Sequence, residues 1–187
     1  AAIAKDARLA SDMGQLRRVV LSAALSGTPA NQLSIVPTED TALRAAVDSC
    51  FNCFYDARSD FALASSVHHT LDKLSQHLPL VGITNGNVNA QKVGLDRYFT
   101  AILHASVERP MKPAQNMFDE AASLVKVTPS HILHVGDNII KDVFGAINAG
   151  YQSAWFACNR PMQLKFEPVS VLPHVQLDSL EELIQFV

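Results

Sequence analysis

Residues 132–142 read Ile-Leu-His-Val-Gly-Asp-Asn-Ile-Ile-Lys-Asp. The first four have the character of a short buried strand, because an apolar run of this length, bounded by turn residues, fits the interior of a parallel sheet. The run stops at Gly136 and Asp137, and residues 139–149 have the pattern of an amphipathic helix. A carboxylate directly after a buried strand is costly unless it is paired or bound to a metal. This stretch therefore predicts a strand that presents Asp137 to a functional site.

The same alternation of apolar runs and helical segments extends over the chain from residue 65 onward. Buried strands are predicted at residues 80–84, 101–104, 132–135, 153–156 and 175–177. Helices are predicted at residues 67–77, 89–95, 114–125, 139–149 and 179–186. Strands separated by helices form right-handed crossovers. We therefore expect an α/β fold with a doubly wound parallel sheet in residues 65–187.

Residues 1–64 have a different, wholly helical pattern and are expected to form a separate lobe. Residues 13–25 have an apolar stripe at helical spacing. Pro37-Thr38-Glu39-Asp40 is a helix-start signal with Thr38 as the expected N-cap. The helix it opens is expected to end near Tyr55, with these residues facing inward: Leu43, Ala46, Val47, Cys50, Phe51 and Phe54.

Composition excludes several classes of protein. The 187 residues carry 15 basic and 18 acidic side chains, a net charge of −3, and 48% are hydrophobic. A mildly acidic chain without a basic block is a poor partner for nucleic acid or an anionic membrane surface. No apolar stretch approaches the ~18 residues of a membrane span, and no secretory signal opens the chain, so we expect a cytoplasmic protein. The three cysteines argue against a disulfide framework, and Cys50 and Cys53 are expected to pack in the core.

Polar clusters follow two of the predicted strands that precede Asp137. Thr84-Asn85-Gly86 offers a hydroxyl and backbone N–H groups that can hold an anionic oxygen, although Asn-Gly is also an ordinary turn pair. Lys112 lies between Pro110 and Pro113 and presents a fixed ammonium that could neutralise a phosphate. The alternative for Lys112 is a solvated loop position. Both clusters lie where ligands bind in open parallel sheets, beyond the carboxyl ends of the strands.

Asp137 is followed by a second acid, Asp142, one turn into the next helix. Two carboxylates beside a lysine suit Mg²⁺, a hard ion that prefers oxygen ligands and keeps several waters. The alternative for Asp137 is a helix N-cap, worth ~1 kcal/mol. An N-cap does not account for Asp142, nor for Gly136, which lets the backbone approach closely.

In this order, Thr-Asn-Gly, Lys-Pro and Gly-Asp-Asn-x-x-x-Asp followed by Gly145-Ala146 resemble the motifs of the haloacid dehalogenase-like (HAD) hydrolase superfamily. The likeness covers roughly residue 67 to the C-terminus, and the helical residues before it resemble the family's inserted α-helical cap. The stretches LPLVGITNGN (residues 78–87), HILHVGD (131–137) and LPHVQL (172–177) look closest to bacterial flavin-pathway phosphatases. Those members act on 5-amino-6-(5-phospho-D-ribitylamino)uracil.

The resemblance implies a role for each matching residue. Thr84 would donate to a phosphoryl oxygen with the backbone at Asn85 and Gly86 assisting, and Lys112 would stabilise negative charge. Asp137 would bind Mg²⁺, and Asp142 would orient Lys112 or a metal-bound water. The implied activity is Mg²⁺-dependent hydrolysis of small phosphate monoesters. Most of the catalysis of phosphoryl transfer comes from positioning and from electrostatic stabilisation.

The family's D-x-D motif, whose first Asp forms the aspartyl-phosphate, has no counterpart here: no two aspartates lie one residue apart. Asp56 and Asp60 are four apart on a predicted helix. This segment alone is therefore expected to be inactive. The strand that carries the motif would lie at the centre of the sheet, between the strands ending at Thr84 and Val135. We expect a gap or an added strand there, filled by an N-terminal segment on a longer chain, and direct pairing of the two strands would contradict this.

Two further functions stay open beside a phosphatase of small phosphorylated metabolites. One is a haloacid dehalogenase on the same scaffold, disfavoured because that chemistry needs no metal. The other is a non-catalytic phosphate-binding domain. Helical charges are usually only solvated, but substrate choice is expected to lie in the cap, where the exposed candidates are Arg17, Arg18, Arg44, Tyr55 and Arg58. His104 and His134 are expected to pack within their strands.

Overall fold

The structure, a computed structural model, describes residues 2–27, 29, 39–158, 160–168 and 170–187. The chain divides into two compact units. The first comprises Ala1–Ala62, Thr84–Leu95 and His104–Met111, and the second comprises Leu63–Ile83, Asp96–Leu103 and Lys112–Val187. The N-terminal helices thus share a unit with the two segments that follow the first two strands, a grouping that the sequence pattern did not anticipate.

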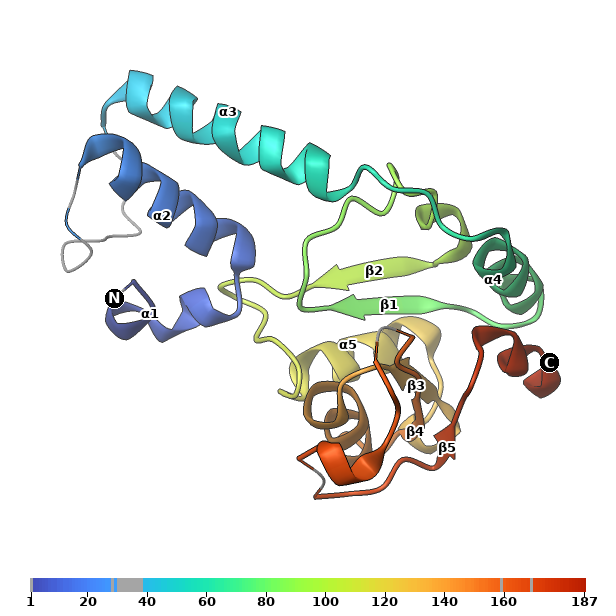
Figure 1. Ribbon diagram of the computed structural model, residues 1–187. Helices are drawn as coiled ribbons and strands as arrows, with labels where there is room; N and C mark the ends of the chain where they lie inside the picture. Colours follow the sequence, from blue (N-terminus) through green and yellow to red (C-terminus); the bar gives the residue numbers. More distant parts are fainter. Residues whose placement is uncertain (1, 28, 30–38, 159, 169) are drawn as a thin grey trace. The chain divides into compact units, whose positions relative to one another are not determined.

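After the short N-terminal helix, the helices of the first unit begin at aspartate caps. The elements are α1 (Ala2–Lys5), η1 (Ala7–Ala10), α2 (Met13–Ser26) and α3 (Thr41–Arg58) (Figure 1). The Asp12 carboxylate accepts from the Gln15 N–H and starts α2, while Asp40 accepts from the N–H groups of Ala42 and Leu43 and starts α3. The expected cap Thr38 lies outside the described residues.

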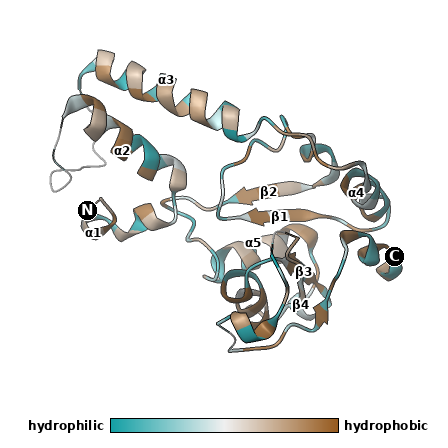
Figure 2. Cartoon of the chain, in the orientation of Figure 1, coloured by the Kyte–Doolittle hydropathy of each residue, from teal (hydrophilic) through white to brown (hydrophobic). Residues whose placement is uncertain are grey.

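α3 buries only a narrow stripe of its surface. Val47 and Phe51, four residues apart, are its buried side chains. Cys50 and Cys53 are exposed free thiols, so the expectation that they pack in the core is wrong. A helix that packs along one row of i and i+4 positions leaves the neighbouring rows in solvent, and Cys50 lies on such a row. Figure 2 shows the resulting mixture of apolar and polar residues along α3.

The strands confirm the α/β class and agree with the predicted positions to within one or two residues. They are β1 (Val81–Thr84), β2 (Ala101–His104), β3 (Leu133–Gly136), β4 (Gln152–Trp155) and β5 (Val175–Gln176). β1 and β2 run in the same direction (Figure 1), with the Thr100 N–H bonded to Leu80 O at 2.8 Å. β3, β4 and β5 form a parallel sheet in which Leu133 lies opposite Gln152.

The described strands form two sheets rather than one. β1 pairs with β2, β3 pairs with β4, and within the described part of the chain β1 and β3 are not hydrogen-bonded to each other. Direct pairing of β1 with β3, which would contradict the expected gap between them, is therefore not seen in this part of the chain. β1 and β3 are half-buried along their whole length, whereas β4 has three buried residues. The prediction of buried strands is thus wrong for β1 and β3, and also for most of β2 and for β5, whereas it holds for three residues of β4.

The remaining elements of the second unit are mostly short. They are α4 (Ser65–His77), η3 (Asp96–Tyr98), α5 (Asn116–Val125), η4 (Pro129–His131), the π-helical η5 (Ile139–Phe144), α6 (Gly145–Asn148), η6 (Leu164–Phe166) and η7 (Leu180–Phe186). The helix expected at residues 89–95 is wrong, because this segment forms turns. The Asn89 side chain accepts from the Lys92 N–H, and Gly94 has a φ of 72°, which reverses the chain.

Apolar clusters hold the elements on either side of β3. Trp155 of β4 packs with Ile139 and Val143 of η5, and Phe118 of α5 packs with Ala146 of α6. These contacts fix the segment after β3, which carries Asp137 and Asp142. Within the ranges that the structure describes, no helix combines the length and the hydropathy needed to cross a membrane.

Candidate active site

A buried hydrogen-bond cluster centres on the carboxylate of Asp142. Its Oδ1 accepts from Lys112 Nζ at 2.7 Å and lies 3.0 Å from His134 Nε2. Its Oδ2 accepts from the Asn138 N–H at 3.0 Å. Lys112 is 8% exposed and Asp142 is 5% exposed. Asp142 is thus held by three donors that come from three segments of the second unit.

Lys112 is not a solvated loop lysine. Besides Asp142, its Nζ donates to the carbonyl of Ile83 in β1 at 2.8 Å. This carbonyl belongs to the residue that precedes Thr84 in the chain. A buried ammonium needs an anionic partner and further acceptors to compensate for lost hydration. The Asp142 carboxylate and the Ile83 carbonyl supply both, and they hold the charge of Lys112 at the carboxyl end of β1.

The protonation states of this cluster follow from burial and pairing. Burial alone would raise the pKa of Asp142, but the hydrogen bond from His134 and the charge of Lys112 outweigh it, so the pKa lies well below its ordinary value. Burial lowers the pKa of His134 from its ordinary value near 6.5, and the Asp142 hydrogen bond only partly offsets this. At neutral pH the cluster therefore consists of an ionised Asp142 and a neutral His134 that donates from Nε2.

Gly136 and Asn138 shape the turn that brings Asp142 back to β3. The Asn138 carboxamide oxygen accepts from the N–H groups of Ile140 and Lys141, which makes it the N-cap of η5. A Cβ on Gly136 would lie 2.7 Å from Asp142 Oδ2 and closer still to the Asp142 Cγ and Cβ. Any side chain at position 136 would therefore displace the carboxylate.

Asp137 has a different environment from Asp142. Its side chain is 56% exposed, and Oδ2 lies 3.2 Å from Arg160 Nη1. Its backbone carbonyl accepts from Trp155 Nε1 at 2.8 Å and from Arg160 Nη2 at 2.7 Å. The N-cap is Asn138, so the alternative of a capping role for Asp137 is wrong. Asp137 is held by its backbone, and its carboxylate projects from the end of β3.

An exposed carboxylate at this position fits Mg²⁺, which takes one or two carboxylates and keeps several waters. Asp142 is committed to Lys112, His134 and Asn138, so Asp137 is the acid available for a metal. Within the described residues, no group of three or more His, Cys, Asp or Glu side chains is arranged to hold an ion. A metal at Asp137 would therefore depend on water or on groups from outside these side chains.

The Thr84-Asn85-Gly86 turn belongs to the first unit. Thr84 Oγ1 accepts from the Gly86 N–H at 2.9 Å, which leaves the hydroxyl proton free to be donated elsewhere. His104 Nδ1 lies 3.2 Å from the Gly86 carbonyl, so this imidazole donates to the turn. In this conformation the Gly86 N–H is bonded within the turn, while the Thr84 hydroxyl can still donate its proton to an anionic oxygen.

The structure thus joins Lys112 with Asp142, and it places Asp137 in the same unit with a different partner. The sequence pattern missed the hydrogen-bonding roles of His134 and Arg160. A polar imidazole within an apolar strand was a signal for His134, since buried polar groups are nearly always bonded. Arg160 lies 23 residues after Asp137, and nothing local marks it.

Comparison with known proteins identifies the family of the chain. The family model of haloacid dehalogenase-like hydrolases matches residues 16–150, so the chain belongs to that hydrolase family. It is 35% identical over 130 residues to 5-amino-6-(5-phospho-D-ribitylamino)uracil phosphatase YigB of Escherichia coli, covering 70% of this chain and 55% of that protein. It is 30% identical over 147 residues to human N-acylneuraminate-9-phosphatase, covering 75% of this chain and 58% of that protein. The chain therefore spans little more than half the length of these relatives.

A solved structure shows the same fold over nearly the whole chain. The 2-haloacid dehalogenase from Pseudomonas syringae superposes with a TM-score of 0.84 and is 28% identical, covering 98% of this chain and 74% of that one. The two sequence relatives named above are thus phosphatases, whereas this structural relative is a dehalogenase.

Proposed function

We propose that the protein is a phosphatase that hydrolyses small phosphate monoesters. The observation that carries the proposal is the buried ammonium of Lys112, held between Asp142 Oδ1 and the Ile83 carbonyl. A fixed positive charge beside a strand terminus stabilises charge that develops on a transferring phosphoryl group. The similarity to two phosphatases in sequence supports the same class.

Each site residue has a defined task in this proposal. Thr84 donates its free hydroxyl proton to a phosphoryl oxygen, and the backbone at Asn85 and Gly86 shapes that binding turn. Lys112 stabilises negative charge, and Asp142 fixes the position of Lys112. Asp137 would hold Mg²⁺, which supplies charge neutralisation when bound.

The nucleophile in this proposal comes from a segment outside this chain, carrying a D-x-D motif and forming an aspartyl-phosphate. The sheet pairing supports this, because within the described residues no strand is hydrogen-bonded to the second edge of β1 or of β3, and an open strand edge is a template for a further strand. We propose that the segment pairs with both strands and completes a single doubly wound sheet. Without it the chain would bind phosphate without turnover.

The substrate class in this proposal is a small phosphorylated metabolite, with the flavin precursor of the Escherichia coli relative as the first compound to test. Neither nucleic acid nor a membrane is part of the proposal, and a cytoplasmic location remains a prediction. Riboflavin biosynthesis would follow as the pathway only if that precursor is the preferred substrate.

A haloacid dehalogenase is the second candidate, because the Pseudomonas syringae relative superposes so closely. The test compares the product of the whole gene with the 187-residue chain. Phosphate release from p-nitrophenyl phosphate and from the flavin precursor is measured with Mg²⁺ and with EDTA, beside halide release from 2-chloropropionate. Mg²⁺-dependent phosphate release by the whole product supports the phosphatase. Halide release with no phosphate release would replace it by the dehalogenase, and neither activity in the whole product would leave a non-catalytic domain.

The strand-completion proposal has its own measurement. Amide hydrogen exchange of β1 and β3 is compared between the chain and the longer product. Pairing of an added strand slows exchange at the inner-edge amides of both strands and leaves those of β5 unchanged. Equal exchange in the two proteins would contradict the pairing.

A further inference from the structure

Three of the five cap residues considered as substrate contacts, Arg17, Arg18 and Tyr55, stack on aromatic rings of α3, and a fourth, Arg44, also has an interaction partner. The Arg17 guanidinium lies 3.7 Å from the centroid of the Phe54 ring. The Arg18 guanidinium stacks on Phe51 and pairs with Asp48. Tyr55 stacks on Phe51, with 6.0 Å between the ring centroids. Arg17 and Arg18 of α2 therefore pack against rings of α3, although the buried Nη1 of Arg17 has no hydrogen-bond partner among the described residues, and Tyr55 stacks within α3 itself.

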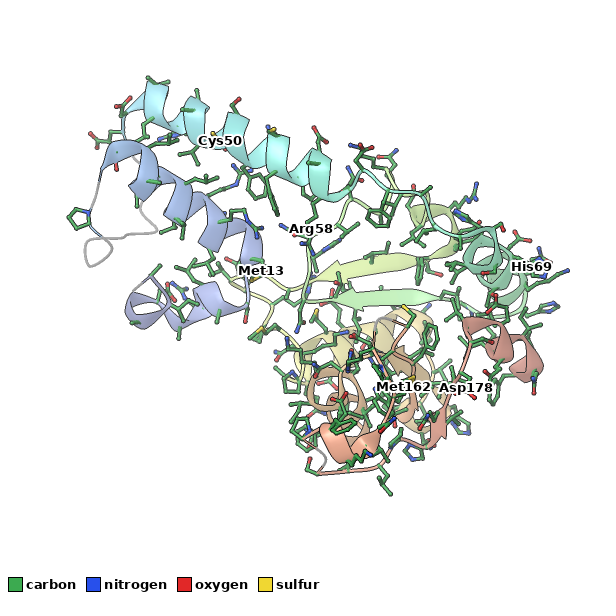
Figure 3. The ribbon with its side chains drawn as sticks, in the orientation of Figure 1. Met13, Cys50, Arg58, His69, Met162 and Asp178 are labelled. Atoms are coloured by element: carbon green, nitrogen blue, oxygen red, sulfur yellow. The ribbon has the colours of Figure 1, made fainter. Side chains whose placement is uncertain are left out.

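Arg58 differs from these four residues. It lies in the last turn of α3, where Figure 3 labels it, and its side chain is exposed. Among the residues that the structure describes, no hydrogen bond, ion pair or ring contact engages its guanidinium. The acid two positions earlier, Asp56, lies 3.9 Å from Lys92 Nζ instead. The positive charge of Arg58 thus has no anionic partner among the described residues.

The guanidinium of Arg58 lies beside the turn that follows β1. Its Nη2 is 3.8 Å from the point that a Cβ on Gly86 would occupy, in the same compact unit. This is the turn in which Thr84 keeps one hydroxyl proton to donate. The turn also contains Asn87, whose buried Nδ2 has no acceptor among the described residues. Arg58 and Thr84 therefore bring unused donors to one short segment.

An oxyanion is the ligand that such donors fit, and phosphate fits better than a carboxylate because it offers more acceptor oxygens to a forked guanidinium. We infer that Arg58 binds a phosphoryl oxygen of the substrate beside the Thr84–Asn87 turn, so that the cap supplies one of the charges that anchor the dianionic end of a phosphate monoester. This inference rests on the proposed phosphatase function. It selects Arg58 from the five cap residues considered as substrate contacts, and it assigns part of phosphate recognition to the cap.

The test measures binding of inorganic phosphate to the 187-residue chain by calorimetry, which needs no turnover. Arg58→Met removes the guanidinium, Arg58→Lys keeps the charge without the fork, and Lys73→Met removes one charge from an exposed position on α4. We expect Arg58→Met to weaken phosphate binding at least about tenfold, since a hydrogen bond to a charged group is lost. The affinity of Arg58→Lys should lie between those of Arg58→Met and the unchanged chain, and Lys73→Met should stay within about twofold, because solvent and salt screen an exposed charge.

Each result decides the inference separately from the proposed function. Equal binding by Arg58→Met and the unchanged chain, or an equal loss in Lys73→Met, overturns the role of Arg58. Absence of phosphate binding by the unchanged chain overturns it as well. In each of these cases Mg²⁺-dependent phosphate release by the whole gene product would still establish the phosphatase. Circular dichroism of the Arg58 variants confirms that they are folded, as an exposed position leads us to expect.

Discussion

His134 Nε2 lies 3.0 Å from Asp142 Oδ1, the same oxygen that accepts a hydrogen bond from the Lys112 ammonium. A residue of strand β3 and a residue before α5 therefore share one acceptor. The ring of His134 also meets the Phe118 ring edge-on, with 5.2 Å between centroids. This contact and the hydrogen bond fix the imidazole, so the position of Lys112 depends on a side chain that would itself touch no substrate.

Asp142 and Asp137 should differ sharply in their contribution to stability. Asp142→Asn leaves the buried Lys112 without its anionic partner and should lower the free energy of unfolding by ~3 kcal/mol. Asp137→Asn breaks only an exposed pair with Arg160 and should cost less than about 1 kcal/mol. Urea denaturation of both variants at pH 7 measures the difference. Equal losses would show that the Lys112–Asp142 pair is not the buried cluster described above.

Position 136 should tolerate no side chain. Gly136→Ala places a Cβ within 2.7 Å of Asp142 Oδ2 and should cost ~2 kcal/mol or more, because the carboxylate has to leave its three donors. Gly14→Ala serves as the control, since it lies in the first turn of α2 and its nearest neighbour would be 3.3 Å away. That neighbour is the Asp12 Oδ1 that caps α2, so we expect the control to change stability by less than about 1 kcal/mol in either direction, as helix propensity opposes the tighter contact. An unchanged denaturation midpoint for Gly136→Ala would contradict the close approach.

The buried imidazole should make the protein less stable below about pH 6.5. The folded-state pKa of His134 is lowered, so the unfolded chain binds a proton that the folded chain does not, and stability is lost as the pH falls. His134→Gln keeps an N–H donor near the Nε2 position but cannot titrate. Its unfolding free energy should therefore decline less steeply between pH 6.5 and pH 5 than that of the unchanged chain.

His134→Leu separates the hydrogen bond from the titration. It removes the donor to Asp142 as well as the ionisable ring, so it should be less stable than His134→Gln at every pH, by ~1–2 kcal/mol. The other histidines are present in both variants and cancel in the comparison. Parallel pH profiles for His134→Gln and the unchanged chain would show that His134 is not a buried neutral donor. The depressed pKa of Asp142 acts in a lower range, because its contribution is present above about pH 4 and is lost only on further acidification.

Arg160 should compete with Mg²⁺ for Asp137. Arg160→Gln removes the guanidinium that lies 3.2 Å from Asp137 Oδ2 and should raise Mg²⁺ affinity roughly threefold to tenfold. Asp137→Asn should abolish measurable binding. Lys165→Gln removes the same charge from a side chain that stacks on Phe166, and it should leave the affinity unchanged. Calorimetric Mg²⁺ titration in the 187-residue chain compares the three, and unaltered affinity in Arg160→Gln would rule out the competition.

Much of the fold was predictable because short apolar runs and helix-start residues are local signals. β2 has the bounds that its four apolar residues predict, and α2 differs from its prediction by one residue. The segment 89–95 was predicted wrongly because its turn depends on Asn89 and on the positive φ of Gly94, which periodicity does not report. Cys50 was misplaced because the apolar pattern of α3 is wider than the stripe that α2 covers.

The candidate site was predictable in part. Residue type and spacing indicated Lys112, Asp137 and Asp142, since a carboxylate or ammonium at a strand end has few structural explanations. They could not indicate that Asp142 is the buried partner of Lys112 while Asp137 projects toward Arg160. The two acids are five residues apart, and only the π-helical turn of η5 determines which of them faces inward.

The sequence by itself determined the order of the strands, most of the helices, the hydrolase family and the identity of the charged residues, because these depend on local periodicity and on motifs read along the chain. The tertiary structure alone decided which charges meet. The His134–Asp142 contact joins residues 8 apart, that of Lys112 and Asp142 joins residues 30 apart, and the Arg58 side chain approaches Gly86 across the turn after β1. Such side-chain contacts depend on how the helices and strands pack, and packing is a property of the whole fold rather than of any stretch of sequence.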